Sequence, residues 1–212
     1  MRPYHKIEGV FKRSPERPHK LLTDQFKREE IEFLRNYPWT FTEKIDGTNI
    51  RVHWDGHKVT FGGRTEAAQI PAHLIERLNE LFIGEVNEQV FEEKFGETPV
   101  TLYGEGYGAK IQKGGGLYSD KADFILFDVL IGDMWLKRDG VEDIAKHFDI
   151  KAVPVVLSGT IDNAVQLVKS GFDSRIAKEK KEAEGLIGTP DCGLLYRNGD
   201  RIIIKLKTKD FI

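Results

Sequence analysis

The sequence predicts a single α+β domain in which mainly antiparallel sheets are flanked by helices. Two observations lead to this fold class. Short β-type segments occur singly and in pairs around tight-turn residues, and segments with helical spacing of apolar residues separate them. No internal repeat and no linker-like stretch divides the 212 residues, so we expect one domain over residues 1–212.

In the first half of the chain, residues 41–60 have the pattern of two strands that turn at Asp55-Gly56. Apolar residues at helical spacing after Pro71 predict a helix that reaches Phe82. The Glu-rich stretch to Phe95 predicts a second helix directly after it. A motif within residues 41–60 is therefore expected to lie in a sheet.

In the second half, clusters of β-type residues predict six further strands. They are Val100–Tyr103, Phe124–Ile131, Val153–Leu157, Leu186–Ile187, Leu194–Arg197 and Arg201–Leu206. The last two are expected to pair as a hairpin across Asn198-Gly199. Helices are expected near 140–148 and 161–170, and the charged run Ala177–Glu184 is expected to be an exposed helix or loop.

Charge and composition restrict the classes of function. The net charge of −2 argues against a uniformly basic surface, yet residues 1–20 carry six Lys/Arg against two Glu. The last sixteen residues carry five Lys/Arg against two Asp, whereas residues 76–97 hold seven Glu against two basic residues. Basic ends weakly indicate a polyanionic ligand, although such charge runs are commonly just solvated faces.

The location predicted from composition is intracellular, that is, cytoplasmic. The first twenty residues are polar and basic, so we expect no signal peptide, and no apolar run approaches the ~20 residues of a membrane span. The single cysteine, Cys192, excludes an internal disulfide and fits a reducing compartment.

The strongest local motif is Glu43-Lys44-Ile45-Asp46-Gly47-Thr48-Asn49. By itself it fits a surface lysine before a turn. Further polar residues stand within or beside β-like segments downstream, however, and their order is informative. They are Arg64 after Gly62-Gly63, Glu105 after Leu102-Tyr103-Gly104, Phe127-Asp128, Glu184-Gly185, and Lys205-Leu206-Lys207.

These six motifs, in this order, resemble the covalent nucleotidyltransferase superfamily and, within it, the phage and kinetoplastid-type RNA ligases. The likeness runs from the Lys44 motif to the C-terminus, about three quarters of the chain, and includes the Tyr107–Gly114 loop. The complete set is highly specific, whereas Lys-x-Asp-Gly alone is weak. The resemblance implies an adenylyltransferase domain that uses ATP and Mg²⁺ or Mn²⁺ to join RNA ends, nicked or single-stranded.

By this resemblance Lys44 is the nucleophile that becomes attached to AMP. A lysine attacks phosphorus only when it is unprotonated, so the chemistry needs desolvation or neighbouring cations that favour the neutral amine. Lys205 and Lys207, expected on an adjacent strand, would supply that charge and would neutralise the α-phosphate in the transition state. Because Leu206 lies between them, both lysines are expected on one strand face. Without the Lys44 motif they would simply be a solvated face.

The resemblance also implies roles for the other motif residues. Glu105 would bind the ribose, Phe127 would stack on adenine, Arg64 would hold ribose or the terminal phosphate, and Asn49 would contact phosphate. Glu43 is placed with them in the nucleotide site.

Glu184 is the expected ligand of the divalent metal, since Mg²⁺ prefers oxygen ligands. The alternative for Glu184 is simple membership of the charged run before it.

The functional prediction is therefore an ATP-dependent RNA ligase that forms lysyl-AMP on Lys44, and three alternatives remain open. The first alternative is a DNA ligase, which usually has arginine where Asn49 stands. The second is a capping guanylyltransferase. Both classes of enzyme normally carry an OB-type domain after the motif of Lys205 and Lys207. We expect no such C-terminal OB domain here. A nucleotide- or RNA-binding module without catalysis would not need the nucleophile. Either a protein partner or the basic residues Lys12, Arg13, Arg17 and Lys20 would replace the OB domain in holding RNA.

Overall fold

The computed structural model describes residues 1–17 and 20–211, and its chain forms two compact units. The first contains residues 1–4, 46–153 and 177–179, and the second contains residues 5–45, 154–176 and 180–212. Each unit has its own sheet and its own hydrophobic core, so each is described separately. The prediction of one domain over residues 1–212 stays a prediction.

The first unit is built on a six-stranded sheet with three helices. Its strands are β5 (Thr48–Trp54), β6 (Val59–Gly62), β7 (Val100–Tyr107), β8 (Asp123–Ile131), β9 (Met134–Trp135) and β10 (Lys151–Ala152). Its helices are α2 (Ala72–Phe82), α3 (Glu85–Phe95) and α4 (Arg138–His147), with a 3₁₀ turn, η1, at Gly115–Leu117. The main strand order is β10-β8-β7-β5-β6, and β9 pairs with β8. All pairs are antiparallel except β10 with β8.

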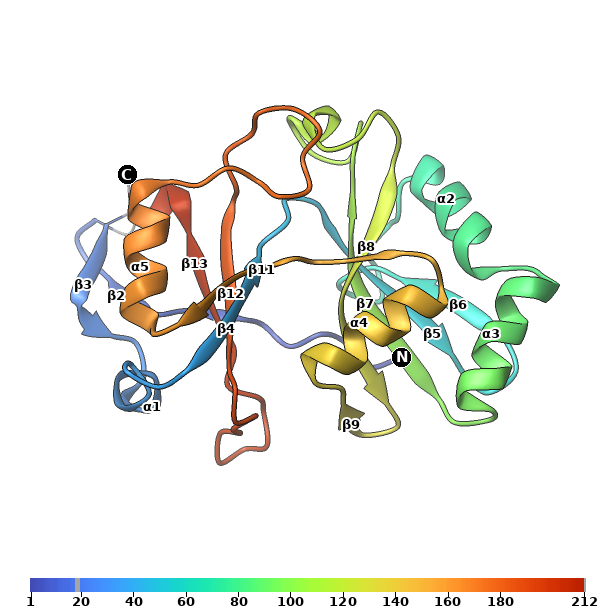
Figure 1. Ribbon diagram of the computed structural model, residues 1–212, viewed down its shortest axis with the longest axis horizontal. Helices are drawn as coiled ribbons and strands as arrows, with labels where there is room; N and C mark the ends of the chain where they lie inside the picture. The colour runs from blue at the N-terminus through green and yellow to red at the C-terminus, as the bar shows by residue number, and fades with distance from the viewer. Residues whose placement is uncertain (18–19, 212) are drawn as a thin grey trace. The chain divides into compact units, whose positions relative to one another are not determined.

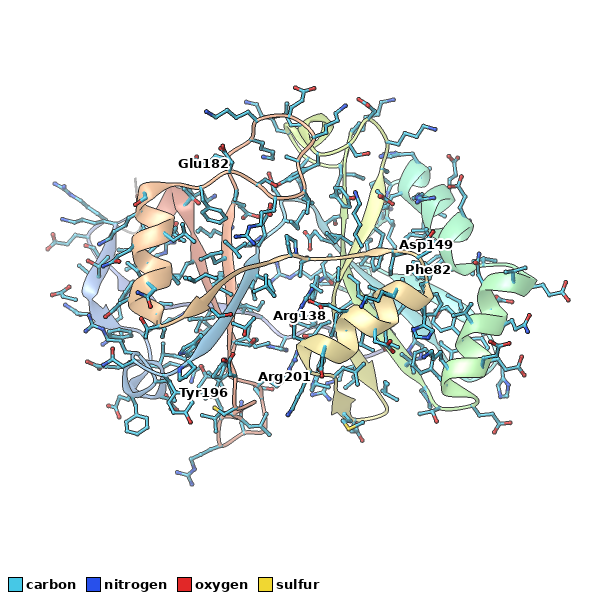
Figure 2. The ribbon with its side chains drawn as sticks, viewed as in Figure 1. Phe82, Arg138, Asp149, Glu182, Tyr196 and Arg201 are labelled. Atoms are coloured by element: carbon cyan, nitrogen blue, oxygen red, sulfur yellow. The ribbon has the colours of Figure 1, made fainter. Side chains whose placement is uncertain are left out.

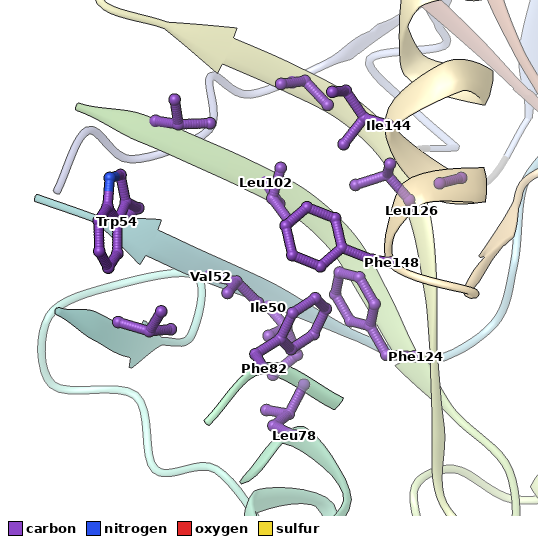
Figure 3. Close-up of a cluster of buried hydrophobic side chains, with 14 of the residues drawn as sticks. Ile50, Val52, Trp54, Leu78, Phe82, Leu102, Phe124, Leu126, Ile144 and Phe148 are labelled. Carbon is purple, nitrogen blue, oxygen red and sulfur yellow. The ribbon is translucent and has the colours of Figure 1, made fainter. Parts of the chain in front are cut away.

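Alternation along β5 separates the two faces of this sheet. Ile50, Val52 and Trp54 point into a core that also receives side chains from α2 and α4, as Figure 3 shows. Since successive strand residues point to opposite faces, Asn49 and Arg51 belong to the face away from this core. The polar residues of β5 therefore gather on one side of the sheet.

A β-bulge in β8 changes this alternation at Phe127. Tyr103 pairs with Asp128, but the next residue, Gly104, pairs with Leu126, so Phe127 is the extra residue. Without the bulge, Asp128 would follow Phe124 and Leu126 on the core face. With it, neither Phe127 nor Asp128 belongs to the hydrophobic core.

The second unit contains a five-stranded sheet, a two-stranded sheet and two helices. Its strands are β1 (Glu8–Gly9), β2 (Phe11–Arg13), β3 (Leu21–Phe26), β4 (Trp39–Glu43), β11 (Val155–Gly159), β12 (Gly185–Pro190) and β13 (Ile204–Lys207). Its helices are α1 (Glu29–Phe33) and α5 (Ile161–Ser170), with a 3₁₀ turn, η2, at Thr208–Asp210. The larger sheet has the order β1-β13-β12-β4-β11, and β2 pairs with β3. Among the described strands of this unit, β1 with β13 is the one parallel pair.

Helix α5 packs against β12 and β13 (Figure 1) and closes the core of the second unit. A capping box fixes its start, because the Thr160 side chain accepts from the Asn163 backbone N–H while the Asn163 side chain accepts from that of Thr160. Its apolar side, including Ile161, Ala164 and Val168, joins Trp39 and Phe41 of β4 in the core. The strand that leads to Lys44 is therefore held from its core side.

These elements confirm the predicted α+β class with mainly antiparallel sheets, and they confirm all four predicted helices. The prediction of two strands in residues 41–60 was wrong, because that stretch contains parts of three. Residues up to Glu43 belong to β4 in the second unit, and only β5 and β6 form the hairpin at Asp55-Gly56. The charged run Ala177–Glu184 is an irregular segment. None of the described helices is both long and apolar enough to cross a membrane.

The hairpin predicted across Asn198-Gly199 is present only at its turn. An isolated antiparallel bridge joins Leu195 to Arg201, and backbone hydrogen bonds run from Tyr196 to Asp200 and from Ile202 to Leu194, but the predicted strands do not continue as a ladder. Tyr196 and Arg201, labelled in Figure 2, lie in this connection between β12 and β13. The turn was recognised correctly, but the strand partners of β13 are β12 and β1, and β12 also contributes Leu186 to the core.

Candidate functional site

Strand β4 places Lys44 next to Gly185. Trp39, Phe41 and Glu43 are buried on one side of β4, so Lys44 is expected on the other by alternation. The Lys44 N–H donates to the Gly185 carbonyl at 2.9 Å, which continues the pairing of β4 with β12 by one residue. On its other side Gly185 pairs with Lys207. Lys44 and Lys207 therefore flank a residue that has no side chain.

The carboxylate of Glu184 joins these two lysines. Lys44 Nζ lies 2.6 Å from Glu184 Oε2, and Lys207 Nζ lies 2.7 Å from Oε1. The three side chains retain only 17–23% of their exposed surface. Burial raises the pKa of the Glu184 carboxyl, but the Lys44 charge and hydrogen bonds from both lysines outweigh it and hold the pKa below its usual range. The structure thus brings three of the predicted site residues into one half-buried ionic cluster.

Gly185 makes this close arrangement possible. A Cβ at residue 185 would lie 1.9 Å from the Leu206 carbonyl oxygen, and the backbone there has φ +149°, a conformation that L side chains rarely adopt. The neighbouring Thr208 fixes the segment from the other side, since its N–H donates to the Glu184 carbonyl and its hydroxyl to the Ala183 carbonyl. The Glu184-Gly185 dipeptide is therefore held tightly against β13.

Lys205 lies on the same face of β13 as Lys207. Ile204 and Leu206 are buried between and beside the two half-buried lysines, which confirms the alternation expected for this strand. Lys205 pairs with Ile187, and Ile187 pairs with Thr42. The prediction that the lysines stand on a strand adjacent to Lys44 was wrong, because β12 lies between β4 and β13. The Glu184 carboxylate nevertheless joins the two outer strands, because it contacts both Lys44 and Lys207.

Glu43 faces the opposite side from Lys44 and is almost fully buried. The Ser174 hydroxyl donates to Glu43 Oε1 at 2.5 Å, and the Arg175 N–H donates to Oε2 at 2.8 Å. The Arg175 guanidinium in turn donates to the carbonyls of Val155 and Val156. Both oxygens of Glu43 are thus engaged by one segment of the second unit, a contact that sequence reasoning missed because serine and arginine in a loop carry no distinctive pattern.

In the first unit, the structure brings Asn49 and Glu105 together. They are directly paired across β5 and β7, on the face away from the core. The Asn49 Oδ1 atom is buried and finds no hydrogen-bond partner within the described residues. A buried amide without a protein partner fits contact with a phosphate through its NH₂ group or with a cation through its oxygen.

Phe127, in the bulge of β8, packs against the N-terminal segment. The rings of Tyr4 and Phe127 meet edge to face with centroids 5.1 Å apart. The Tyr4 hydroxyl donates to Asp128 Oδ2 at 2.7 Å, and its ring also contacts Tyr103. Tyr4 therefore braces both bulge residues. The sequence gives no indication of this role, because a single tyrosine in a basic N-terminal segment has no distinctive pattern.

Arg64 is exposed in the bend that follows β6. The segment before it is fixed by Arg51, whose Nε donates to the Gly63 carbonyl at 2.7 Å and whose Nη1 pairs with Glu66 at 3.0 Å. The Arg51 side chain is fully buried. An arginine that alternates with Ile50 and Val52 was the available signal for such an anchor, and the sequence analysis did not use it.

The described residues contain no cluster of three or more His, Cys, Asp or Glu side chains that could hold a metal ion. A cation at Glu184 would therefore have one protein carboxylate and take its other ligands from water and substrate phosphate. That donor set fits Mg²⁺, which usually keeps several waters and binds through one or two carboxylates. The metal role of Glu184 stays a prediction.

Comparison with known proteins identifies the family. Residues 37–207 match the family model described as RNA ligase. The chain belongs to the RNA ligase family. The matched region begins just before β4 and ends at Lys207, so it contains every predicted site residue, and the resemblance drawn from the motifs is confirmed. No curated protein matches the sequence.

Several solved structures of the RNA ligase of Naegleria gruberi share the fold. A mutant solved with ATP and Mn is 20% identical, with a TM-score of 0.62 over 84% of this chain and 51% of that one. The structure with PPi is 22% identical, with a TM-score of 0.62 and the same coverage. Another mutant, with AMP and Mn, is 19% identical, with a TM-score of 0.64 over 95% of this chain and 59% of that one. This chain spans little more than half the length of the Naegleria ligase.

Proposed function

We propose that this chain is an ATP-dependent RNA ligase that joins 5′-phosphate and 3′-hydroxyl ends through a lysyl-AMP intermediate on Lys44. The observation that carries the proposal is the contact of Glu184 with both Lys44 and Lys207. Two ammonium groups that share one carboxylate, on either side of a glycine packed closely against β13, suit the binding of a phosphate. Membership of the RNA ligase family supports the same chemistry.

The proposed reaction has three steps. The Lys44 amine attacks the α-phosphorus of ATP, so that a P–N bond forms and the bond to pyrophosphate breaks. The AMP then passes to a 5′-phosphate of RNA, and Lys44 regains its free amine. Finally a 3′-hydroxyl attacks the activated 5′-phosphate, a phosphodiester forms, and AMP leaves.

The ionic cluster has a specific part in the first step. A protonated amine has no lone pair, so Lys44 must leave its ion pair with Glu184 and lose a proton before it attacks. Lys207, with Lys205 on the same face, would then neutralise charge that develops on the α-phosphate. A divalent cation held by Glu184 would add charge neutralisation at the phosphate oxygens.

The remaining predicted residues keep their proposed roles. Phe127 stacks on adenine, Glu105 binds ribose, Arg64 holds ribose or the terminal phosphate, and Asn49 contacts phosphate. Glu43 has both oxygens occupied within the protein, so we assign it to holding the Ser174 segment in place of direct contact with the nucleotide.

Mass spectrometry of the intact protein tests the proposal. After incubation with ATP and Mg²⁺ or Mn²⁺, the wild type should gain the mass of one AMP, and Lys44→Ala should not. Lys58→Ala, which removes an exposed lysine of the first unit, is the matched control and should still gain AMP. An adduct on Lys44→Ala, or none on the wild type, would refute the proposed nucleophile.

The RNA step needs a separate experiment. Pre-adenylated RNA with a 3′-hydroxyl partner should be sealed with Mg²⁺ and without ATP, and matched DNA ends should be sealed more slowly. Adduct formation without sealing of any RNA form would indicate that a protein partner completes the ligase.

A further inference from the structure

The second unit contains a groove of about 620 Å³ along β1, β2 and β13. Seven Lys or Arg side chains line it, against two carboxylates. Its lysines come from five separate places along the unit: Lys6, Lys12, Lys27, the pair Lys205 and Lys207, and Lys209. The groove therefore collects positive charge from both ends of the sequence.

Backbone pairing joins the two sides of this groove. Strand β1 runs parallel to β13, with Gly9 opposite Lys205. The lysines just before and after β1 are thus attached to the same sheet edge as the lysines of β13. The groove is part of the folded sheet, and it continues directly from two residues assigned to phosphate chemistry.

The carboxylates of the groove are already occupied. Glu8 pairs with Lys27 at 2.8 Å and with Arg28 at 2.7 Å, and Asp210 pairs with Arg13 at 2.8 Å. Within the part of the chain that the structure describes, no ion pair engages Lys6, Lys12 or Lys209. These three exposed ammonium groups are consequently available to an anionic ligand.

The kind of charge indicates the kind of anion. A site for one terminal phosphate or triphosphate typically offers a helix N-terminus, a nest of backbone N–H groups or a bidentate arginine. Here the available donors are lysine ammonium groups on flexible stems, and the one arginine of the groove is engaged by Asp210. Dispersed point charges suit a nucleic-acid backbone, which presents successive phosphates and is held without reading its bases.

We infer that this groove binds the phosphate backbone of single-stranded RNA and leads it to Lys205 and Lys207. The inference rests on the proposed function, because it names the path by which the RNA substrate reaches the ligase site. Of the N-terminal cations expected to hold phosphates, Lys12 and Arg13 line the groove, whereas Arg17 and Lys20 do not. Lys6 and Lys209, which the sequence analysis did not single out, also line the groove.

RNA binding by a triple variant tests the inference. Lys6→Ala, Lys12→Ala and Lys209→Ala are combined, and Lys58→Ala, Lys146→Ala and Lys151→Ala form a control that removes the same charge from exposed lysines of the first unit. Fluorescence anisotropy with a labelled 5′-phosphorylated single-stranded RNA is measured over a range of salt. The groove variant should bind at least about tenfold more weakly at low salt. The slope of log K against log[salt] should fall in magnitude by about 2, since each lost single-strand contact removes about 0.7.

Lys44–AMP formation, measured on the same proteins, separates this inference from the proposed function. Both triple variants should gain one AMP and melt at the wild-type temperature. RNA affinity equal to that of the control variant would overturn the groove assignment. So would weakened AMP transfer from ATP with unchanged RNA binding, which would make the groove a triphosphate site. Absence of any adduct on the wild type would count against the ligase proposal alone, because the RNA-binding comparison remains valid without it.

Discussion

The hydroxyl of Ser174 donates a hydrogen bond to Oε1 of Glu43, the buried carboxylate one residue before Lys44. Ser174 lies on the segment that ends at Glu184, and its backbone N–H is held by the Lys181 carbonyl. The residue before the proposed nucleophile therefore anchors the segment that carries the partner of that nucleophile. The two carboxylates serve different purposes, since Glu43 is enclosed by protein donors and Glu184 is bound by lysines.

Removal of this anchor should lower both stability and adduct formation. Ser174→Ala leaves one oxygen of a buried carboxylate without its donor, which costs about 1–3 kcal/mol. Urea unfolding measures the free energy, and the rate of AMP attachment measures the function. Ser158→Ala, at an exposed serine of β11, is the control and should change neither. Equal behaviour of the two variants would contradict the anchoring role.

Gly185 should not tolerate even a methyl group. Gly185→Ala would place Cβ 1.9 Å from a backbone oxygen that cannot move without distorting β13, so we expect a loss above about 3 kcal/mol or insoluble protein. Gly116→Ala provides the comparison, because no atom lies within 4 Å of the added carbon. Thermal unfolding and soluble yield report the difference. A stable Gly185→Ala protein would show that β12 and β13 are more loosely paired than in this structure.

The ionic cluster should make stability depend on pH in the acid range. The pKa of Glu184 lies below its usual value of 4.5 because the attraction of Lys44 and Lys207 exceeds the effect of burial. Its stabilisation is therefore fully present above about pH 4.5 and is lost as the pH falls through the lower folded-state pKa. The difference in melting temperature between wild type and Glu184→Gln should shrink between pH 6 and about pH 3. Glu92→Gln, at an exposed carboxylate of α3, should show no comparable trend.

Phe127 and Tyr4 should differ in what they contribute to nucleotide use. Phe127→Ala removes the proposed stacking surface, so the apparent affinity for ATP should fall about tenfold or more, and Phe127→Tyr should retain it. Tyr4→Phe removes the hydrogen bond to Asp128 but keeps the ring contact, and should cost about 1 kcal/mol of stability. Titration of ATP against AMP attachment measures the first effect. Unchanged affinity in Phe127→Ala would remove Phe127 from the adenine site.

Local patterns predicted the helices and most strands of this chain and the pairing of β5 with β6, but they did not predict the pairings between distant strands. The 3.6-residue spacing before Phe82 and the turn at Asp55-Gly56 act over a few residues, and both predictions were confirmed. The strand Arg201–Leu206, which contains Lys205, was assigned to a hairpin with residues 194–197, whereas β13 pairs with β12 and with β1, whose partner residues lie almost two hundred positions away. Burial of a shared core decides such pairings, and a short turn signal does not contain that information.

The same limit applies to the candidate site. The polar residues that interrupt β-like segments could be recognised individually, since each departs from its surroundings. The bulge at Phe127 could not be predicted, because it arises from the fit of β8 to β7. The contacts of Ser174 and Tyr4 also could not be predicted from local sequence, because the partner of each residue lies more than a hundred positions away in the chain.

The ion pair of Lys44 with Glu184 spans 140 residues of chain, so the two residues are synthesised at well-separated times. Strand β4 pairs only with β11 and β12, both of which follow residue 154. At roughly 5–20 residues per second a ribosome needs about 7–28 s to make the intervening stretch. Until β11 has been made, for most of that time, Trp39 and Phe41 have no partner strand, so the nascent chain exposes an apolar strand that can associate with other chains. Slower growth at low temperature or added chaperone should raise the yield of folded protein more than any change to the mature surface.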